Sequence, residues 1–106
     1  MGMFRAIVKR PEELYGHESN VFDSLRSMQE IVGGYIQTLT LDSQVVIICN
    51  EEGRIRGMDP NCVVCGIPFY GPIIAIGYDG KGNFADLPIK MARWKSHYLK
   101  MKKIGG

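Results

Sequence analysis

Two short apolar runs without a break constrain the fold of this chain more than any other feature. "VVIIC" covers residues 45–49, and "IIAIGY" covers residues 73–78. A run without polar alternation is typical of a strand that is not half exposed. The first run therefore predicts a strand covered on both faces, and the second predicts another buried strand.

Weaker patterns around these runs predict the other strands and turns. The residues over 3–8 and over 35–41 alternate with a period of two, and each segment is predicted to be a strand. "DSQ" after the second segment predicts a hairpin turn into the strand at residues 45–49. Further on, "MDPN" indicates a turn and "CVVCGI" a strand. "PFYGP" indicates a loop that either exposes Phe69 and Tyr70 or packs them over the sheet.

Two segments have helical periodicity. Asn20 can cap a helix that runs to Val32, with Gly33 as a left-handed C-terminal cap. Residues 87–103 predict a second helix with Leu87, Met91, Trp94, Tyr98 and Met101 on its docking face. The fold class is α+β: a mostly antiparallel sheet of about five or six strands, one packed internal helix and a basic C-terminal helix.

The length of 106 residues predicts a single domain over residues 1–106. No segment approaches the roughly 18 consecutive apolar residues that span a bilayer, so no membrane contact is expected. The N-terminus "MGMFRAIVKR" has a charge after four residues and lacks the long apolar core of a secretory signal. A cytoplasmic location follows as the expectation.

The residues that usually carry catalysis or bind metal are sparse. Cys62 and Cys65 form one C-x-x-C pair, but its two valine spacers favour a strand, and His17 and His97 have no ligand-like spacing to it. No Ser-His-Asp or Cys-His arrangement is suggested by motif. We expect no catalytic residues, no metal site and no cofactor, so the protein is interpreted as non-enzymatic.

The polar stretch "CNEEGRIRGMDPN" holds the candidate ligand site. "NEEG" has the composition of a tight hairpin turn with Gly53 at a positive φ. On the following strand Arg54 and Arg56 would project from one face, either as paired anion-binding groups or as the wet side of a hairpin. The candidate ligand-binding residues are Asn50, Arg54, Arg56, Asn61, Phe69 and Tyr70.

The roles of the two asparagines in that set stay open. Each side chain can satisfy the backbone of a turn, or it can recognise the edge of a base or amide ligand.

The C-terminal segment offers an alternative site. Residues 1–86 contain seven basic and eleven acidic residues, whereas the last twenty contain six basic residues and no acid. A basic helix on an acidic body can contact nucleic acid, an anionic membrane, an acidic partner or the acidic surface of a neighbouring subunit, or it can be a solvated face. The residues concerned are Lys90, Arg93, Lys95, Lys100, Lys102 and Lys103.

Four segments together resemble a known family. They are "FRAIVKRPEE", "MQEIVGGYIQTLTL", "VVIICNEEGRIRGMDPN" and "IIAIGYDGKGNFADLP", and they resemble the family called domain of unknown function DUF3846. The resemblance covers a family-like core over residues 1–88 and leaves 89–106 as a basic C-terminal helix and tail. It implies a setting in phages, plasmids and bacteria that carry mobile elements, often among accessory or anti-defence genes, and it supplies no catalytic residues.

Two functions are compatible with these observations. The first is an oligomer that sequesters a small nucleotide-like ligand at the arginine stretch. The second is an interaction module that binds a host protein or nucleic acid through the basic helix or a strand edge.

Overall fold

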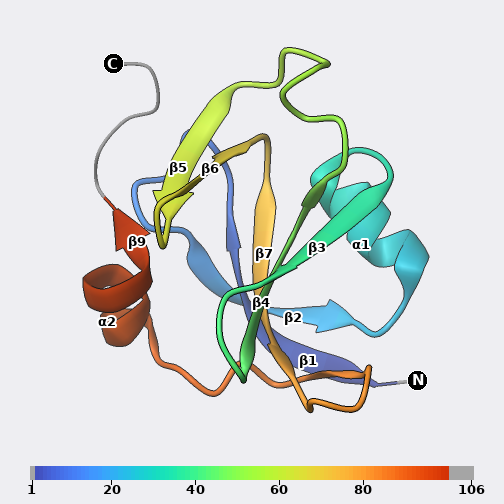
Figure 1. Ribbon diagram of the computed structural model, residues 1–106. Coiled ribbons are helices and arrows are strands. Elements are labelled where there is room, and N and C mark those ends of the chain that lie inside the picture. Colours follow the sequence, from blue (N-terminus) through green and yellow to red (C-terminus); the bar gives the residue numbers. More distant parts are fainter. Residues whose placement is uncertain (1, 101–106) are drawn as a thin grey trace.

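The computed structural model describes residues 2–100 and confirms the α+β class with a mostly antiparallel sheet (Figure 1). The large sheet has the order β2-β1-β7-β4-β3, with β8 paired to β7, and a smaller sheet has the order β6-β5-β9. The large sheet consists of β1 (Met3–Lys9), β2 (His17–Phe22), β3 (Ile36–Thr40), β4 (Val45–Asn50), β7 (Ile73–Tyr78) and β8 (Phe84–Ala85). The other elements are β5 (Pro60–Val64), β6 (Ile67–Tyr70), β9 (Leu99–Lys100), α1 (Leu25–Val32), α2 (Met91–Arg93) and the π-helical turn η1 (Trp94–Tyr98).

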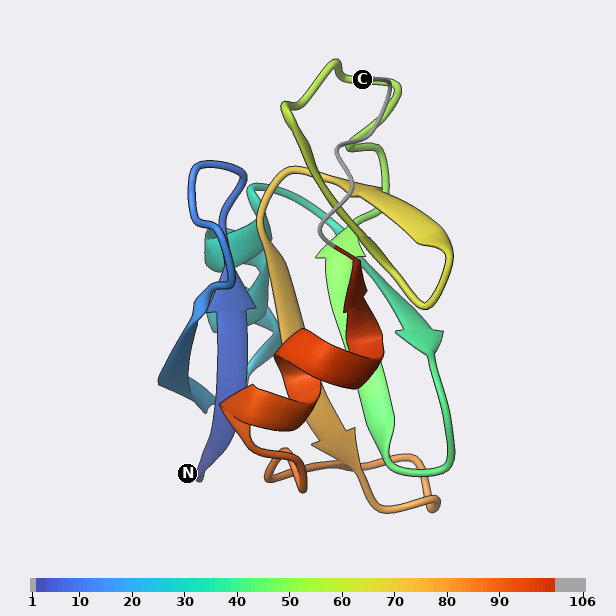
Figure 2. The same ribbon diagram turned by 90° about the vertical axis from the view of Figure 1, so that its left-hand side faces the viewer.

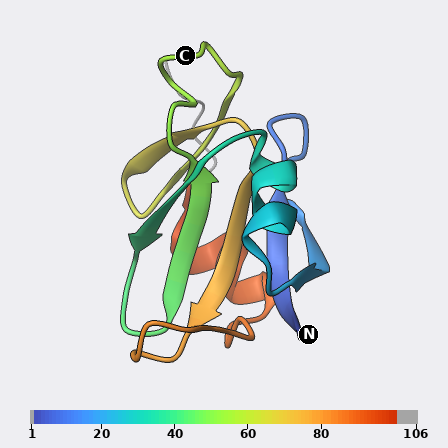
Figure 3. The same cartoon turned by 90° about the vertical axis from the view of Figure 1, so that its right-hand side faces the viewer.

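The large sheet separates two apolar cores. Helix α1 covers one face, and the small sheet with α2 and η1 covers the other, so these layers lie on opposite sides (Figures 2 and 3). Strand β4 lies between β3 and β7, and all six of its residues are buried. The expectation for "VVIIC" is confirmed, and "IIAIGY" is likewise the buried strand β7. No helix among residues 2–100 is long and apolar enough to cross a membrane.

The first helix begins four residues later than its pattern predicts, because its N-cap is residue 24 and not residue 20. Ser24 is the N-cap, and its hydroxyl accepts a hydrogen bond from the backbone N–H of Ser27. Asn20 lies instead in β2, opposite Arg5 of β1, with Val21 buried and Phe22 exposed. Neighbouring side chains therefore point to opposite faces of a strand in this segment, where the sequence pattern predicted the first turn of a helix. The predicted left-handed cap at Gly33 is confirmed by its φ of 82°.

The C-terminal helix is much shorter than the predicted 87–103. Pro88 disfavours helical backbone at Leu87, and the helical segment begins at Met91. It ends after Tyr98, because Leu99 turns into β9 and pairs with Val64 of β5. Met101, expected on the docking face, lies outside the described residues.

Residues 62–70 form a hairpin in place of the predicted strand and loop. Cys65 and Gly66 are its two turn residues, and both have positive φ, 49° and 82°. Two-residue turns with positive φ at both positions match the twist of antiparallel strands. "PFYGP" therefore contributes strand β6, with Phe69 buried, rather than a loop.

The Tyr98 hydroxyl joins η1 to the β3–β4 turn by donating to Asp42 Oδ2 at 2.6 Å. This hydrogen bond is the main cause that lowers the pKa of Asp42 and the main cause that raises the pKa of Tyr98. A lowered carboxyl pKa gives stability that is lost as pH falls through the folded value, and a raised phenol pKa gives stability that is lost as pH rises through it. The bond therefore stabilises the fold most between about pH 4 and pH 10.

We predict that Tyr98→Phe lowers the free energy of unfolding by about 1 kcal/mol at pH 7, since Asp42 is exposed and the bond is screened by water. The loss should shrink as the pH falls below about 4 and vanish once the pH is below the lowered folded pKa of Asp42, where the carboxyl is protonated in both proteins. Urea unfolding of wild type and variant at a series of pH values measures this difference. Tyr35→Phe is the control at a 70% exposed tyrosine. A loss for Tyr98→Phe that is independent of pH would contradict the assignment.

Candidate functional site

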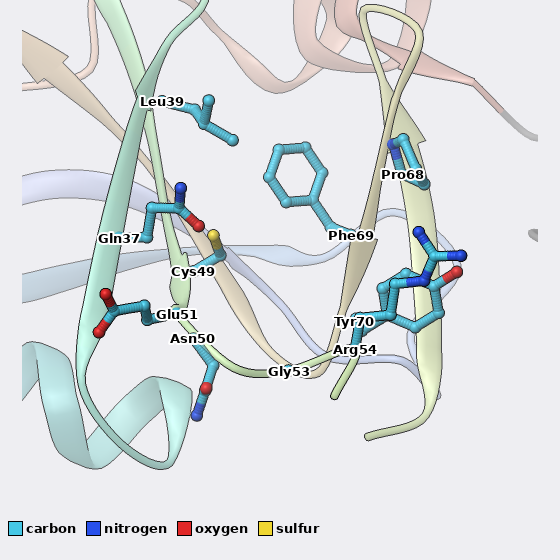
Figure 4. A pocket seen from close by; sticks show the side chains of 10 residues that line it. All are labelled: Gln37, Leu39, Cys49, Asn50, Glu51, Gly53, Arg54, Pro68, Phe69 and Tyr70. Atoms are coloured by element: carbon cyan, nitrogen blue, oxygen red, sulfur yellow. The ribbon is translucent and has the colours of Figure 1, made fainter. Parts of the chain in front are cut away.

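One pocket lies between the two sheets, where β3 and β4 face β6 (Figure 4). Its volume is about 160 Å³. The turn that follows β4 closes one end. The lining residues are Gln37, Leu39, Cys49, Asn50, Glu51, Gly53, Arg54, Pro68, Phe69 and Tyr70.

The alternation of side chains along the strands determines which residues face the pocket. Gln37 and Leu39 are two residues apart on β3, so they share a face, and Gln37 is paired with Cys49 of β4. Phe69 extends from β6 toward Leu39 and is 3% exposed. The floor is therefore apolar, and the polar groups lie toward the rim.

Residues 51–57 form consecutive turns rather than the predicted hairpin and strand. The N–H of Arg56 donates to the carbonyl of Glu52 at 2.8 Å, and that of Met58 donates to the carbonyl of Gly53 at 2.9 Å. The first bond has the four-residue spacing of an α-helix, and the second spans five residues across Gly57, whose φ of 70° ends the segment as in a helix C-terminal cap. Strand β5 then pairs with β6 and β9 and not with β4. The interpretation of Arg54 and Arg56 as neighbours on one strand face is therefore wrong.

Gly53 is required by close packing and not by a positive φ, which it does not have. A Cβ at this position would lie 2.8 Å from the carbonyl oxygen of Tyr70. A Cβ at Gly71 would lie 2.8 Å from the sulfur of Met58. The turn after β4 thus packs directly on the end of β6, and this contact holds Arg54 beside the pocket.

The two arginines have different surroundings. Arg56 forms an exposed ion pair with Glu52, with 3.7 Å between Nε and Oε1. Arg54 is among the residues that line the pocket (Figure 4), and within residues 2–100 its guanidinium has no ion-pair partner. Arg54 is therefore the cation that is available to an anionic ligand in the pocket.

The side chain of Asn50 hydrogen-bonds to the backbone of neighbouring segments, although the residue borders the pocket. Its side-chain amide donates to the carbonyl of Val32 at 3.2 Å, and its Oδ1 accepts from the N–H of Glu52 at 2.8 Å. In Figure 4 the side chain points away from Phe69. Of the two roles left open for Asn50, the hydrogen bonds support the structural one.

Asn61 does not line the pocket, and its side chain also makes hydrogen bonds within the protein. Its Nδ2 donates to the carbonyls of Lys9 and Gly71 at 2.8 Å each, and its Oδ1 accepts from Lys9 Nζ at 2.7 Å. Lys9 is 3% exposed, and burial lowers its pKa. Asn61 therefore partners a buried cation, a role that a local sequence pattern did not indicate.

Two of the three thiols, those of Cys49 and Cys62, are buried and held in the protonated form. Burial raises the pKa of Cys49, which lines the pocket, and raises that of Cys62 to about 11. A protonated thiol is a poor nucleophile and a poor metal ligand. Cys62 lies buried in β5, while Cys65 lies exposed at the hairpin turn. Among residues 2–100, no three His, Cys, Asp or Glu side chains come together as a metal site would require.

Sequence reasoning missed several pocket residues. Gln37 and Glu51 supply an amide and a carboxylate to the rim, on the side opposite Arg54 (Figure 4). One signal for Gln37 was present, because it is the polar member of the row Tyr35, Gln37 and Leu39. The other lining residues outside the predicted set are Leu39, Cys49, Gly53 and Pro68.

The basic C-terminal residues do not form the long helical face that was expected. Lys90, Arg93 and Lys95 are exposed, and Lys95 Nζ lies 4.3 Å from the centre of the Tyr15 ring. Lys100 lies in β9, after the helical segment has ended at Tyr98. The Lys100 side chain and all of Lys102 and Lys103 lie outside the described part of the chain.

Comparison with known proteins identifies the family. The family model described as Domain of unknown function (DUF3846) matches residues 4–101. The chain belongs to this family. The DUF3846 match continues beyond the expected core of residues 1–88, so it includes α2 and η1. Neither the curated proteins nor the solved structures contain a match to this DUF3846 protein.

Proposed function

We propose that this protein binds and sequesters a small nucleotide-like ligand in the pocket between β3 and β6. One observation carries the proposal: the guanidinium of Arg54, which has no ion-pair partner among residues 2–100, stands beside a pocket lined by Phe69 and Tyr70. A planar cation that binds phosphate and an aromatic surface that stacks on a base are the two groups that recognise a nucleotide.

The size of the pocket supports binding of one part of such a ligand. A volume of about 160 Å³ is close to that of an engineered cavity of about 150 Å³ that holds a benzene molecule. Pockets that enclose whole drug-sized ligands are about 300 Å³ or larger. The heterocycle would therefore enter beside Phe69, and the sugar and phosphate would remain at the rim.

The charges at the rim set the orientation of the ligand. Glu51 repels a phosphate, whereas Arg54 attracts it, and the two side chains lie on opposite sides of the opening (Figure 4). The amide of Gln37 can both donate to and accept from the edge of a base. The phosphate is therefore assigned to Arg54 and the base edge to Gln37.

The chemistry of the lining supports retention of the ligand rather than its conversion. The thiol of Cys49 is held protonated by burial, and Asn50 already uses its amide in the fold. General acid–base catalysis needs a group with a pKa near the working pH, and the lining supplies no histidine. We therefore propose a non-enzymatic protein without a cofactor.

The biological setting in the proposal comes from the family resemblance. A ligand-sequestering accessory protein of a phage or mobile element, acting in the cytoplasm of a bacterial host, would lower the concentration of a nucleotide signal. Such an activity would counter a host defence that depends on that signal. The alternative partner is a host protein or nucleic acid held by exposed Lys90, Arg93 and Lys95.

Native mass spectrometry of wild-type protein purified from bacterial cells tests this proposal. We expect a noncovalent adduct that is released on denaturation and whose mass and fragments contain phosphate. Protein that carries no adduct, and whose melting temperature does not change with any nucleoside mono-, di- or cyclic phosphate, would contradict it. Co-purified nucleic acid or a host protein in place of a small adduct would favour the alternative.

A further inference from the structure

Strand β3 forms one outer edge of the large sheet (Figures 2 and 3). The carbonyl of Tyr35 accepts from Glu51 N–H at 2.9 Å, and the N–H of Leu41 donates to the Val45 carbonyl at 2.8 Å, so both groups face β4. Backbone groups in an antiparallel pair alternate between the two sides of the strand. The N–H and C=O groups of Ile36, Thr38 and Thr40 must therefore face away from β4, toward the open edge.

This edge lacks the features that usually protect a free strand. Residues 35–41 contain no charge and no proline, and the pairing of β3 with β4 has no bulge. The other outer strands are protected: β2 begins with His17 and Glu18, β6 contains Pro68, and β8 and β9 have two residues each. Edge β3 is thus the one outer strand of the described chain that is open to another strand.

We propose that β3 pairs with β3 of a second copy of this chain, antiparallel and with the two-fold axis at Thr38. In this register Thr38 stands opposite the partner's Thr38, and Ile36 stands opposite the partner's Thr40. These are the residues whose backbone groups face outward, so the pair forms a closed ladder of backbone hydrogen bonds. The two large sheets then become one continuous sheet.

The side chains along this edge complement themselves in the same register. Gln37 stands opposite the partner's Leu39, and Tyr35 stands opposite the partner's Leu41, at distances where cross-strand side chains make contact. Tyr35 is 70% exposed in the single chain, and Leu41 is partly buried against the core. The contact would cover the exposed ring, and no charge meets a like charge. This self-complementarity favours a second copy over an unrelated strand.

A two-fold axis perpendicular to the sheet keeps both pockets on the same face of the dimer. Gln37 and Leu39 line each pocket and also flank the axis, so each copy extends the open side of its partner's pocket. The pairing itself does not depend on the proposed ligand, because it rests on backbone groups of β3.

Sedimentation equilibrium of the full chain tests the pairing with Thr38→Pro and Thr38→Val. Proline removes only the outward N–H at this position, so the pairing with β4 is kept, whereas valine keeps that N–H. We expect wild type and Thr38→Val to sediment as dimers of the 11.9 kDa chain. For Thr38→Pro we expect at least a tenfold higher dissociation constant with an unchanged circular dichroism spectrum. A wild type that is monomeric at about 1 mM, or a Thr38→Pro variant that dimerises like wild type, would overturn the proposal.

Cross-linking provides a second readout that does not depend on a proline variant. In a background of Cys65→Asn, which removes an exposed thiol, Thr38→Cys should give a disulfide-linked dimer on mild oxidation. Residues opposite each other in a hydrogen-bonded pair have Cα atoms about 5.5 Å apart, within the range for a disulfide. Thr40→Cys is the control, because residue 40 faces residue 36 of the partner. Equal cross-linking of the two cysteine variants would overturn the register.

Discussion

Asn61→Ala should lower the free energy of unfolding by about 3 kcal/mol, because it removes the side-chain partner of a buried cation. The Asn61 side chain makes three hydrogen bonds, at 2.7 Å to Lys9 Nζ and at 2.8 Å to each of two backbone carbonyls. Lys9 Nζ keeps backbone carbonyl partners at Glu13 and Arg10, at 2.6 and 3.4 Å. The variant therefore leaves Lys9 only partly compensated in a site that is 3% exposed.

The expected fall in melting temperature is about 10 to 20 °C for a domain of this size, and differential scanning calorimetry measures it directly. Asn20→Ala is the matched control, since Asn20 is exposed on β2 and should change the free energy of unfolding by less than about 0.5 kcal/mol. Replacing the pair together, as Lys9→Met with Asn61→Leu, should recover part of the loss because no charge then remains buried. An Asn61→Ala variant as stable as Asn20→Ala would show that Asn61 is not part of the folding core.

The parts of the fold that the sequence predicts well are those that depend on neighbouring residues. The apolar runs of β4 and β7 predict that these strands are buried, and they are. The glycine at position 33 predicts the end of α1, and Gly33 has the left-handed backbone of a helix C-terminal cap. Each of these signals is local, because hydrophobic period and glycine conformation act within a few residues. They identify the central strands and the end of α1.

The errors arise where a distant partner decides the local structure. "NEEGRIRG" has the composition of a hairpin turn, but β5 pairs with β6 and β9 instead of returning along β4. The C-terminal helix pattern continues to residue 103, yet Leu99 leaves the helix to pair with Val64, 35 residues earlier in the chain. Tertiary pairing overrides propensity in both cases.

The same distinction applies to the candidate site. Arg54, Phe69 and Tyr70 line one pocket, although Arg54 reaches it from a helical turn and not from the predicted strand. Asn61 could not be separated from a ligand-binding residue by sequence, since its partner Lys9 lies 52 positions away. The pocket's second wall, with Gln37, comes from the pairing of β3 with β4.

The loss of ligand on Arg54→Gln is the largest functional effect that we predict. Arg54 supplies the pocket's guanidinium, and a hydrogen bond to a charged group contributes about 1.5–3 kcal/mol. Its removal should weaken binding by about 10- to 150-fold. The melting temperature of the unliganded protein should stay nearly unchanged, because the side chain is exposed and has no ion pair among residues 2–100.

Arg56→Gln is the matched control for this variant. It removes the same charge two residues away, from a guanidinium that pairs with Glu52 at the surface. Long-range electrostatic attraction would be reduced equally by the two substitutions, so a difference between them reports on the pocket itself.

Native mass spectra of wild type, Arg54→Gln and Arg56→Gln, purified in parallel from the same cells, test the central claim most directly. The quantity to compare is the fraction of protein that carries the phosphate-containing adduct. We predict full retention in Arg56→Gln and loss of the adduct in Arg54→Gln. Equal retention in both variants, with loss only when Lys90, Arg93 and Lys95 are neutralised, would contradict the assignment of the pocket as the ligand site.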